Sequence, residues 1–525
     1  MNKNSLKTNF ISGFLVFLIA LPLCLGISKA SGFPPIAGIY TAIIGGLLVT
    51  FLSKAPLAIK GPAAGLIAIA IAAVDELGAG DPILGYKLTL AVVVVSGAIQ
   101  IVLGLLRFGT MGDIFPISVL RGMLAAIGLT IMSKEIHVVF GVVPEAKKPL
   151  NLLAEVPNSI VHLNPKVTVI GILSLLLLFI LPAIKNAFVK KLPAPLLVLL
   201  IAIPLGFVFQ LSLEHSFILG STEHNVIPSQ LMVDLPENFF GGITFPDFSQ
   251  VFSGPSIKYI IMFALVGSIE SVLSAKAIDS LDPKGRETQL NKDLVAVGVG
   301  NTIAGFIGGL PMISEIVRSS ANINAKAEGR MSNFFHGLFL FLFVLLAAAV
   351  IKSIPNAALA AMLVYTGYKL AAPEKFISTG KIGIDQLLQF LTTLVVTLMT
   401  DLLIGVISGI VLKIMIEFVQ GVKLKEVFRL NMDIGKEGDN VVINITGIAS
   451  FMNYLKFKKI FDQQEKKHKL ILDFTKATFI DHTFLHNING MKGKFEKEGG
   501  EIITRGLEHH RSLSKHELST RRLKS

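Results

Sequence analysis

The stretch GGLPMISEIVRSSAN, residues 308–322, decides the fold, because it interrupts a long apolar region with glycine, proline and two charges. The glycines and the proline stop the preceding helix. The pattern predicts a new helix that begins near Met312, with Ser314 as its N-cap. A helix that starts inside a bilayer leaves free N–H groups and the positive end of its dipole there, and these attract an anion.

Two charges follow this break. Glu315 and Arg318 are three residues apart, so both can face one side of the new helix. Ionisable residues at membrane depth are costly, which favours a functional interpretation. The alternative is a buried pair that only locks two helices together. We interpret the stretch as half of an anion site with Ser314, Glu315, Arg318 and Ser319 as its substrate-binding residues.

The composition indicates a polytopic membrane protein. The chain has 525 residues, 52% of them hydrophobic and only 16% charged, with long apolar runs. Residues 421–525 hold 20 Lys and Arg against 13 Asp and Glu, so +7 of the net charge of +12 lies there. This suits a cytoplasmic tail near anionic lipid, and no nucleic-acid motif is present. Cys24 is the single cysteine, which excludes an internal disulfide and a Cys-rich metal site.

The apolar segments fall into two halves of seven. With roughly 20 apolar residues per span, we predict spans near 10–28, 36–52, 86–106, 114–133, 166–184 and 192–211, then near 256–275, 291–308, 331–351, 355–372, 382–399 and 401–420. Two shorter pieces, 61–74 and 312–324, cannot cross alone, and each is the third element of its half. Interrupted helices at matching positions are typical of inverted-repeat transporters.

Lys and Arg are more frequent in the loops that this count places inside, such as those with Lys185, Lys190 and Lys191. Loop 212–255 has acidic residues, among them Glu214 and Glu237, but no Lys or Arg. The positive-inside rule therefore predicts that both termini are cytoplasmic.

The first half repeats the break of the second. Lys60 precedes Gly61, Pro62 and Ala63, and proline favours the opening of a helix. Two half-helix N-termini are therefore expected to point at each other near the midplane, with Lys60, Gly61, Pro62 and Ala63 as the substrate-binding residues of the first. The alternative for Lys60 is that its side chain reaches the inner surface.

One more carboxylate lies in an apolar span. Glu270, with Ser274 one turn further along, can bind a coupling cation, carry a proton or neutralise a basic partner. The charges of Lys60, Glu270, Glu315 and Arg318 sum to zero, so an arriving anion would need a co-transported Na⁺ or H⁺, with Glu270, Ser274 and Glu315 as the candidate coupling residues. His336 is interpreted as a hydrogen-bonded packing residue.

After Val419 the pattern becomes that of a small α/β domain. Strands are expected near 441–446, 469–474 and 501–504, with helical segments near 451–468 and 484–498. The last dozen residues are basic and are expected to be loose. This gives a transport domain at 1–420 (repeats 10–211 and 256–420), a linker at 421–436 and a cytoplasmic domain at 437–525.

Several motifs resemble the SulP family of anion transporters, the sulfate permeases, over essentially the whole chain. They are ALP at residues 20–22, GFPPIAGIYTA at 32–42, Gly61-Pro62, and GLP at 309–311 followed by Arg318, Ser319 and Asn322. The tail is similar to a STAS domain, with Asp481-His482-Thr483 where that domain usually has Asp-Ser-Ser or Asp-Ser-Thr. The resemblance implies fourteen segments in a uracil-permease-like fold, a homodimer and an elevator-type motion.

By position, Arg318 matches the family's arginine at the head of the tenth helix, and Glu270 matches its acidic residue in the eighth. Lys60 and Glu315 stand where small or polar residues are usual, so the anion shell differs from a chloride-type one. His482 leaves Thr483 as the only hydroxyl of the STAS loop and as a candidate regulatory phosphorylation site.

The expected function is secondary active transport of a small inorganic anion, sulfate or bicarbonate, coupled to a cation or proton across a bacterial inner membrane. The alternatives are an uncoupled, channel-like anion conductor and a carrier of organic dicarboxylates. No nucleophile–base or metal constellation indicates an enzyme, and no cofactor is expected. The expected partners are the anion, membrane lipid, a second copy of the chain and a cytoplasmic protein that binds the STAS-like domain.

Overall fold

The computed structural model describes residues 3–146, 148–184, 193–213, 215–219, 222–226, 228–236, 239–422, 430–438, 440–463, 469–497 and 499–524. Five residues that entered the prediction of orientation lie outside these residues: Lys185, Lys190, Lys191, Glu214 and Glu237. Six helices of the described part are long and apolar enough to cross a membrane: α1, α5, α6, α8, α11 and α19.

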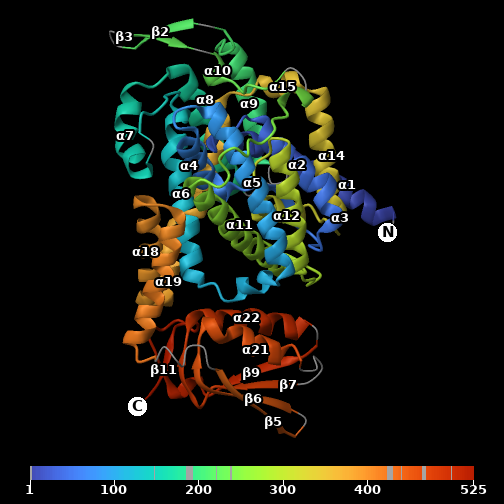
Figure 1. Cartoon of the computed structure of the whole chain (residues 1–525), viewed down its shortest axis with the longest axis vertical. Coiled ribbons are helices and arrows are strands. Elements are labelled where there is room, and N and C mark those ends of the chain that lie inside the picture. The colour runs from blue at the N-terminus through green and yellow to red at the C-terminus, as the bar shows by residue number, and fades with distance from the viewer. Residues whose placement is uncertain are drawn as a thin grey trace. The chain divides into compact units, whose positions relative to one another are not determined.

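The first seven membrane elements occur in the predicted order (Figure 1). They are α1 (Lys3–Ala30); α2 (Ile36–Ile44), continued by a π-helical turn (Gly45–Val49) and α3 (Thr50–Leu52); β1 (Ile59–Pro62) with a 3₁₀ turn (Ala64–Leu66) and α4 (Ile67–Gly78); α5 (Pro82–Leu105); α6 (Ile117–Val139); α8 (Pro165–Ile180); and α9 (Ala194–Val208).

The second seven follow the same plan. They are α11 (Gly254–Leu281); α12 (Leu290–Phe306); β4 (Met312–Glu315) with α13 (Ile316–Asn324); α14 (Met331–Leu346), followed by α15 (Ala348–Lys352); α16 (Asn356–Leu370); α18 (Ile384–Met399); and α19 (Leu402–Val419). The predicted fourteen segments are therefore confirmed, with the third element of each half interrupted.

Five helices and strands of the described residues lie where loops were expected. The segment 134–165 contains α7 (Pro149–Val161), and α17 (Pro373–Ile382) precedes α18. The loop 212–255 contains a hairpin of β2 (His215–Leu219) and β3 (Thr222–Val226) and the short helix α10 (Pro228–Leu231). Helix α7 escaped detection because it is only thirteen residues long and contains Pro157, a weak helix pattern.

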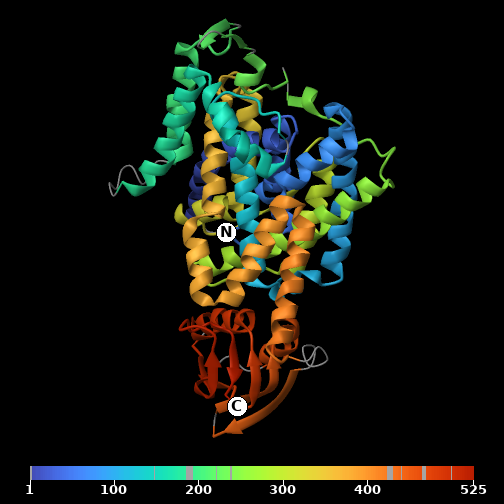
Figure 2. The same ribbon diagram turned by 90° about the vertical axis from the view of Figure 1, so that its left-hand side faces the viewer.

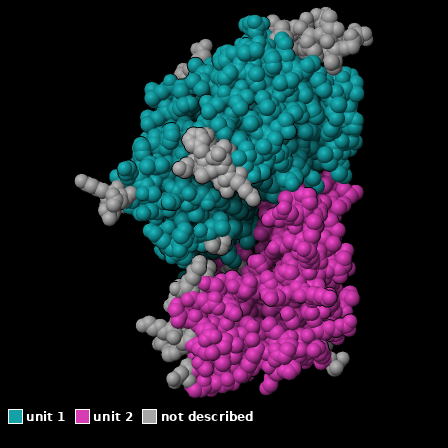
Figure 3. Space-filling view, turned by 180° about the vertical axis from the view of Figure 1, so that it is seen from behind, with its two compact units in different colours: residues 1–109, 127–370 teal, residues 110–126, 371–525 magenta. Residues whose placement is uncertain are grey.

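The chain divides into two compact units, coloured in Figure 3. Unit 1 comprises residues 1–109 and 127–370, and unit 2 comprises residues 110–126 and 371–525. The last two membrane helices thus group with the C-terminal domain. In Figure 2, α18 and α19 run side by side within unit 2.

The C-terminal domain of unit 2 is a mixed sheet with two helices. The strand order is β10-β11-β8-β6-β7-β9, with β5 also paired to β6. The strands are β5 (Leu430–Glu437), β6 (Asn440–Ala449), β7 (Lys469–Asp473), β8 (Ala477–Ile480), β9 (Glu501–Arg505), β10 (His510–Ser512) and β11 (Arg521–Leu523), and the helices are α21 (Tyr454–Phe461) and α22 (His482–Lys497). Phe457, Phe474 and Phe484 form the centre of the core.

Two expectations about this domain need correction. The last dozen residues are not loose, because β11 pairs with both β10 and β8. An unpaired β8 would leave an open sheet edge, and β11 closes it. Residues 430–437, placed mostly in the linker from sequence, form β5, which pairs with β6 along its whole length.

Buried polar contacts join this domain to the membrane helices of unit 2. Lys413 of α19 lies 3.0 Å from Glu417 and 3.4 Å from Asp481, and all three are buried. Asp481 also accepts hydrogen bonds from the backbone N–H groups of Phe451 and Phe484. The hydroxyl of Thr520 donates to Asp385 of α18 at 2.8 Å. Charged groups at such a junction hold one geometry, because a displaced partner leaves a buried charge unpaired.

His482 and Thr483 begin α22 and are both buried. His482 Nδ1 is 2.8 Å from the carbonyl of Leu518, so it carries the proton in the neutral ring. Burial lowers the pKa of His482 to about 4. The carbonyl of Leu518 and the charge of Asp481 raise this pKa in part, whereas His486 and Lys413 lower it slightly.

We predict that the C-terminal domain loses stability below neutral pH. The folded pKa of His482 lies below its ordinary value of 6.5, so the stabilisation is complete above pH 6.5 and is lost as the pH falls towards 4. The loss approaches about 3 kcal/mol. Limited proteolysis of the full chain should cleave this domain faster at pH 4.5 than at pH 7. His482→Gln should flatten the difference, whereas His509→Gln, at an exposed position, should keep it. An unchanged pH dependence in His482→Gln would contradict this assignment.

Candidate anion site

The two interrupted segments of unit 1 meet as a pair of short antiparallel strands. Strand β1 pairs with β4 in the register Lys60 with Ser314 and Gly61 with Ile313, and the N–H of Ala63 donates to the carbonyl of Pro311 at 3.0 Å. All eight strand residues are buried. Backbone groups at membrane depth need internal partners, and each strand supplies them for the other.

This pairing corrects two local predictions. Met312 does not begin a helix and Ser314 is not an N-cap, because residues 312–315 are extended and α13 starts at Ile316. Gly61 and Pro62 likewise belong to β1, and helical structure resumes at Ala64. Sequence reasoning found both breaks but not their pairing, since four-residue strands have no periodicity to detect.

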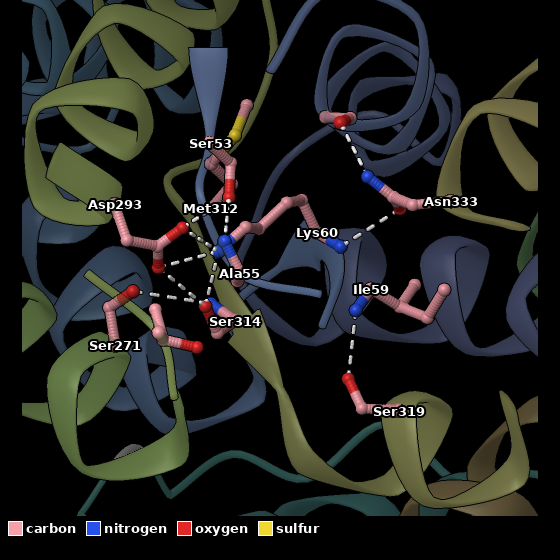
Figure 4. A network of polar contacts seen from close by, with 12 residues as sticks. Ser53, Ala55, Ile59, Lys60, Ser271, Asp293, Met312, Ser314, Ser319 and Asn333 are labelled. Carbon is pink, nitrogen blue, oxygen red and sulfur yellow. Dashed lines mark hydrogen bonds and ion pairs between the residues drawn. The ribbon is translucent and has the colours of Figure 1, made fainter. Parts of the chain in front are cut away.

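Side chains from neighbouring elements satisfy the remaining strand amides. Ser319 accepts from the N–H of Ile59 at 2.8 Å, and Asn333 accepts from that of Lys60 at 3.1 Å. On the other strand, Asn301 accepts from Met312 at 2.5 Å and Ser271 from Ser314 at 3.3 Å. Ser319, which we expected to bind substrate, therefore holds the crossing together (Figure 4).

Lys60 does not reach the inner surface. Its ammonium is 2.7 Å from both carboxylate oxygens of Asp293 and 2.5 Å from the hydroxyl of Ser314. Lys60 is 1% exposed and Asp293 is 2% exposed. Ser53 donates a further hydrogen bond to Asp293 (Figure 4). An ammonium has three donors, so the partners of Lys60 are complete. Sequence reasoning missed Asp293, because it lies in the first turn of α12, where an acidic residue is ordinary.

Arg318 has the opposite environment. It is completely buried, and Nε, Nη1 and Nη2 have no hydrogen-bond partner within the described part of the chain. A Cβ at Gly61 would collide with Nη1, so the guanidinium lies directly against β1. A guanidinium carries five donors in a planar fork that matches an oxyanion. Leaving them unsatisfied in a buried space is costly unless an anion binds there.

Two carboxylates flank the start of the first half-helix. The N–H of Gly65 donates to Glu270 of α11, and the N–H of Ala64 donates to Glu315. These amides, which we expected to face the anion, are therefore occupied. Each carboxylate keeps one buried oxygen without a partner in the described residues, Oε2 of Glu270 and Oε1 of Glu315. The two groups also interact with each other electrostatically. Ser274 lies one turn beyond Glu270 and is buried.

His336 of α14 is not the hydrogen-bonded packing residue that we expected. It is completely buried, and neither ring nitrogen has a partner among the described residues. Its ring interacts electrostatically with Arg318, as does the thiol of buried Cys24. His336 is therefore a second buried side chain whose hydrogen-bonding atoms are unsatisfied within the described residues, and it lies within electrostatic range of the guanidinium. In the sequence, only the polarity of His336 distinguished it from its phenylalanine-rich surroundings, and this did not indicate a binding role.

The fold and this crossing define the class: a polytopic membrane protein built from two repeats with paired, interrupted third elements and a buried cationic centre between them. Residues 6–393 match the model of the sulfate permease family, and the chain belongs to that family.

Curated relatives agree over most of the length. The protein named "Putative sulfate transporter YvdB" from Bacillus subtilis (strain 168) is 24% identical over 518 residues, which cover 97% of this chain and 92% of the relative. The bicarbonate transporter BicA of Synechocystis sp. is 25% identical over 410 residues, 77% of this chain and 68% of that protein.

Solved structures show the same fold. The transmembrane domain of a cyanobacterial bicarbonate transporter BicA gives a TM-score of 0.63 at 22% identity, covering 78% of this chain and 98% of that one. The overall structure of SLC26A9 gives 0.69 at 14% identity, covering 96% and 85%. The second match extends through the C-terminal domain, as expected for a STAS-like fold.

We predict that a methyl group at position 61 disables the anion site without unfolding the protein. In Gly61→Ala the Cβ displaces the guanidinium of Arg318, which weakens its hydrogen bonds to an oxyanion and lowers anion affinity about 10-fold or more. Gly329→Ala is the control, because a Cβ there meets open space. Stabilisation by sulfate or bicarbonate can be followed in detergent with a thiol-reactive fluorogenic dye that reports exposure of Cys24. Equal stabilisation of Gly61→Ala and Gly329→Ala would contradict the placement of the anion.

Proposed function

We propose that the protein is a secondary active transporter of a small inorganic oxyanion, sulfate or bicarbonate. The observation that carries this proposal is the completely buried guanidinium of Arg318, whose three nitrogens have no hydrogen-bond partner in the described residues. The relatives named for sulfate and bicarbonate support the substrate class.

A transported anion suits this guanidinium better than a fixed counter-ion. Of the two buried cations at the crossing, Lys60 has a carboxylate of its own, while Arg318 has none within hydrogen-bond distance. A permanent carboxylate on Arg318 would compete with substrate, and leaving it open provides charge-assisted, bidentate donors for an arriving oxyanion. Gly61 allows the approach, and His336 offers a further donor.

Coupling follows from the charges around the crossing. Asp293 adds a carboxylate to the four groups identified from sequence, so two cations now face three carboxylates. Lys60 and Asp293 cancel, which leaves Arg318 with Glu270 and Glu315. When a monovalent anion neutralises Arg318, the two neighbouring carboxylates repel each other unless protons or a cation bind with it. We therefore propose symport, with Glu270 and Glu315 as the coupling groups and Ser274 as a neighbouring ligand.

The elements that hold the site are tied together and are proposed to move as one body in an elevator-type cycle. Hydrogen bonds connect α2 with the segment before β4 through Thr41, α13 with the segment before β1 through Asn322, and α14 with the first repeat through Asn333. A homodimer in a bacterial inner membrane, with both termini cytoplasmic, completes the proposal.

Regulation at Thr483 stays a prediction. The hydroxyl is 1% exposed and has no partner in the described residues. A kinase would therefore reach it only after the first turn of α22 opens. Phosphopeptide mapping that repeatedly covers this peptide without finding phosphate would exclude it.

We predict that Arg318→Ala abolishes uptake of labelled sulfate and bicarbonate into proteoliposomes, and that Arg318→Lys retains only a small fraction. An ammonium keeps the charge but loses the bidentate geometry. Arg330→Ala, at an exposed arginine outside the anion site, is the control. Normal uptake by Arg318→Ala would refute the site, and large currents without any ion coupling would favour an anion channel.

We further predict that Glu270→Gln and Glu315→Gln remove the driving effect of an imposed cation or proton gradient while anion exchange continues. The amides keep the volume but cannot bind the coupling ion. Counterflow of labelled anion should be measured on the same variants, because it requires anion binding and translocation but no net movement of the coupling ion. Gradient-driven uptake that survives both substitutions would place coupling elsewhere.

A further inference from the structure

The oxygen atoms around Nζ of Lys60 form a cation-binding shell. Both oxygens of Asp293 lie at 2.7 Å and the hydroxyl of Ser314 at 2.5 Å. The hydroxyl of Ser53 contacts Asp293, and that of Ser271 accepts from the backbone of Ser314 (Figure 4). A carboxylate with several hydroxyls is the kind of hard-oxygen set that small metal cations prefer.

Five elements or connecting segments supply Lys60, the two residues whose oxygens contact its ammonium, and the two serines that hydrogen-bond to those residues. Lys60 comes from β1, Ser314 from β4, Asp293 from α12 and Ser271 from α11, and Ser53 directly follows α3. The shell therefore lies where both repeats meet. The ammonium of Lys60 neutralises Asp293 next to the paired strands β1 and β4. A mobile cation at this place would link its own binding to the geometry of the anion site.

We infer that Lys60 is a tethered cation that permanently occupies a monovalent-cation site, so that sodium does not bind at the crossing and transport is driven by protons. The inference about driving ion rests on the proposed function. The ammonium is covalently attached to β1, so its effective concentration at Asp293 greatly exceeds that of a dissolved ion. Glu270 and Glu315 keep one unpartnered oxygen each in the described residues, which suits a proton better than a metal ion that requires several ligands.

Removing the tether should convert the shell into a sodium site. In Lys60→Ala the carboxylate of Asp293 remains with the hydroxyls of Ser53 and Ser314, and the side-chain volume of lysine becomes available. Sodium should then replace the ammonium and stabilise the variant by mass action.

The experiment compares wild type, Lys60→Ala and Lys60→Ala/Asp293→Asn, with Lys54→Ala as control because Lys54 is exposed six residues earlier. Purified full-length protein is melted in sodium gluconate or choline gluconate, with the thiol-reactive dye reporting exposure of Cys24. Binding of ²²Na⁺ is measured on the same samples. Neither readout requires transport.

We expect no sodium effect for wild type and Lys54→Ala, and a saturable rise in Tm of about 2–4 °C for Lys60→Ala. A Lys60→Ala protein that remains folded only in sodium would equally support a cation site that Lys60 normally occupies. The double variant, which lacks the carboxylate, should fold without a sodium response. Saturable ²²Na⁺ binding to wild type would overturn the inference, as would a folded Lys60→Ala that ignores sodium.

Uptake assays separate this inference from the proposed function. Absence of sulfate and bicarbonate uptake by wild type, together with the expected sodium response of Lys60→Ala, would refute the proposed function and leave the tethered cation in place. Uptake driven by a sodium gradient in wild type would retain the transporter and overturn the tethered cation.

Discussion

The pairing of β1 with β4 is the constraint on which the rest of unit 1 depends. Each strand interrupts a helix at membrane depth, and neither could exist there alone, because its backbone groups would face hydrocarbon without partners. Pairing gives these backbone groups hydrogen-bond partners. It also aligns β1 with β4, although the paired residues are 250 or more positions apart in the sequence. Lys60 and Glu315 belong to this crossing, Arg318 lies against it, and Glu270 contacts the turn that follows β1, so the geometry of binding depends on backbone hydrogen bonds.

The two buried cations at this crossing have different environments. The difference indicates a structural role for Lys60 and a ligand-binding role for Arg318. Lys60 is saturated by Asp293 and Ser314, and a saturated buried pair fixes a geometry. Arg318 is equally buried but unsatisfied, and that state persists only where the surrounding structure enforces it. The pair stabilises the crossing, whereas the arginine keeps binding energy available for a ligand.

Much of the fold could be predicted from sequence, because hydrophobic length and interruption are local signals. The fourteen segments, their two halves and both breaks follow from apolar runs, Gly61-Pro62 and Gly309-Leu310-Pro311. The site was harder. Arg318, Glu270 and Glu315 were identified by their charge in apolar surroundings, but Asp293 was missed because it sits near a helix start where acids are common. Met312–Glu315 was assigned to a helix, since strand structure there arises only from a partner in the other repeat. Nothing local distinguished Lys60, a bound cation, from a ligand for substrate.

The contact between Lys413 and Asp481 affects how deletion variants of this protein should be interpreted. Lys413 belongs to a membrane helix, yet one of its two carboxylate neighbours, Asp481, immediately precedes the second helix of the C-terminal domain. Cutting the chain after α19 removes Asp481 and Phe451 and leaves the ammonium with Glu417 alone. A truncated protein that expresses poorly or fails to transport would then report a damaged helix pair, not the loss of a sensor. Charge-neutral replacements at Lys413 and Glu417, made together with the truncation, are needed before any regulatory role is read from such a deletion.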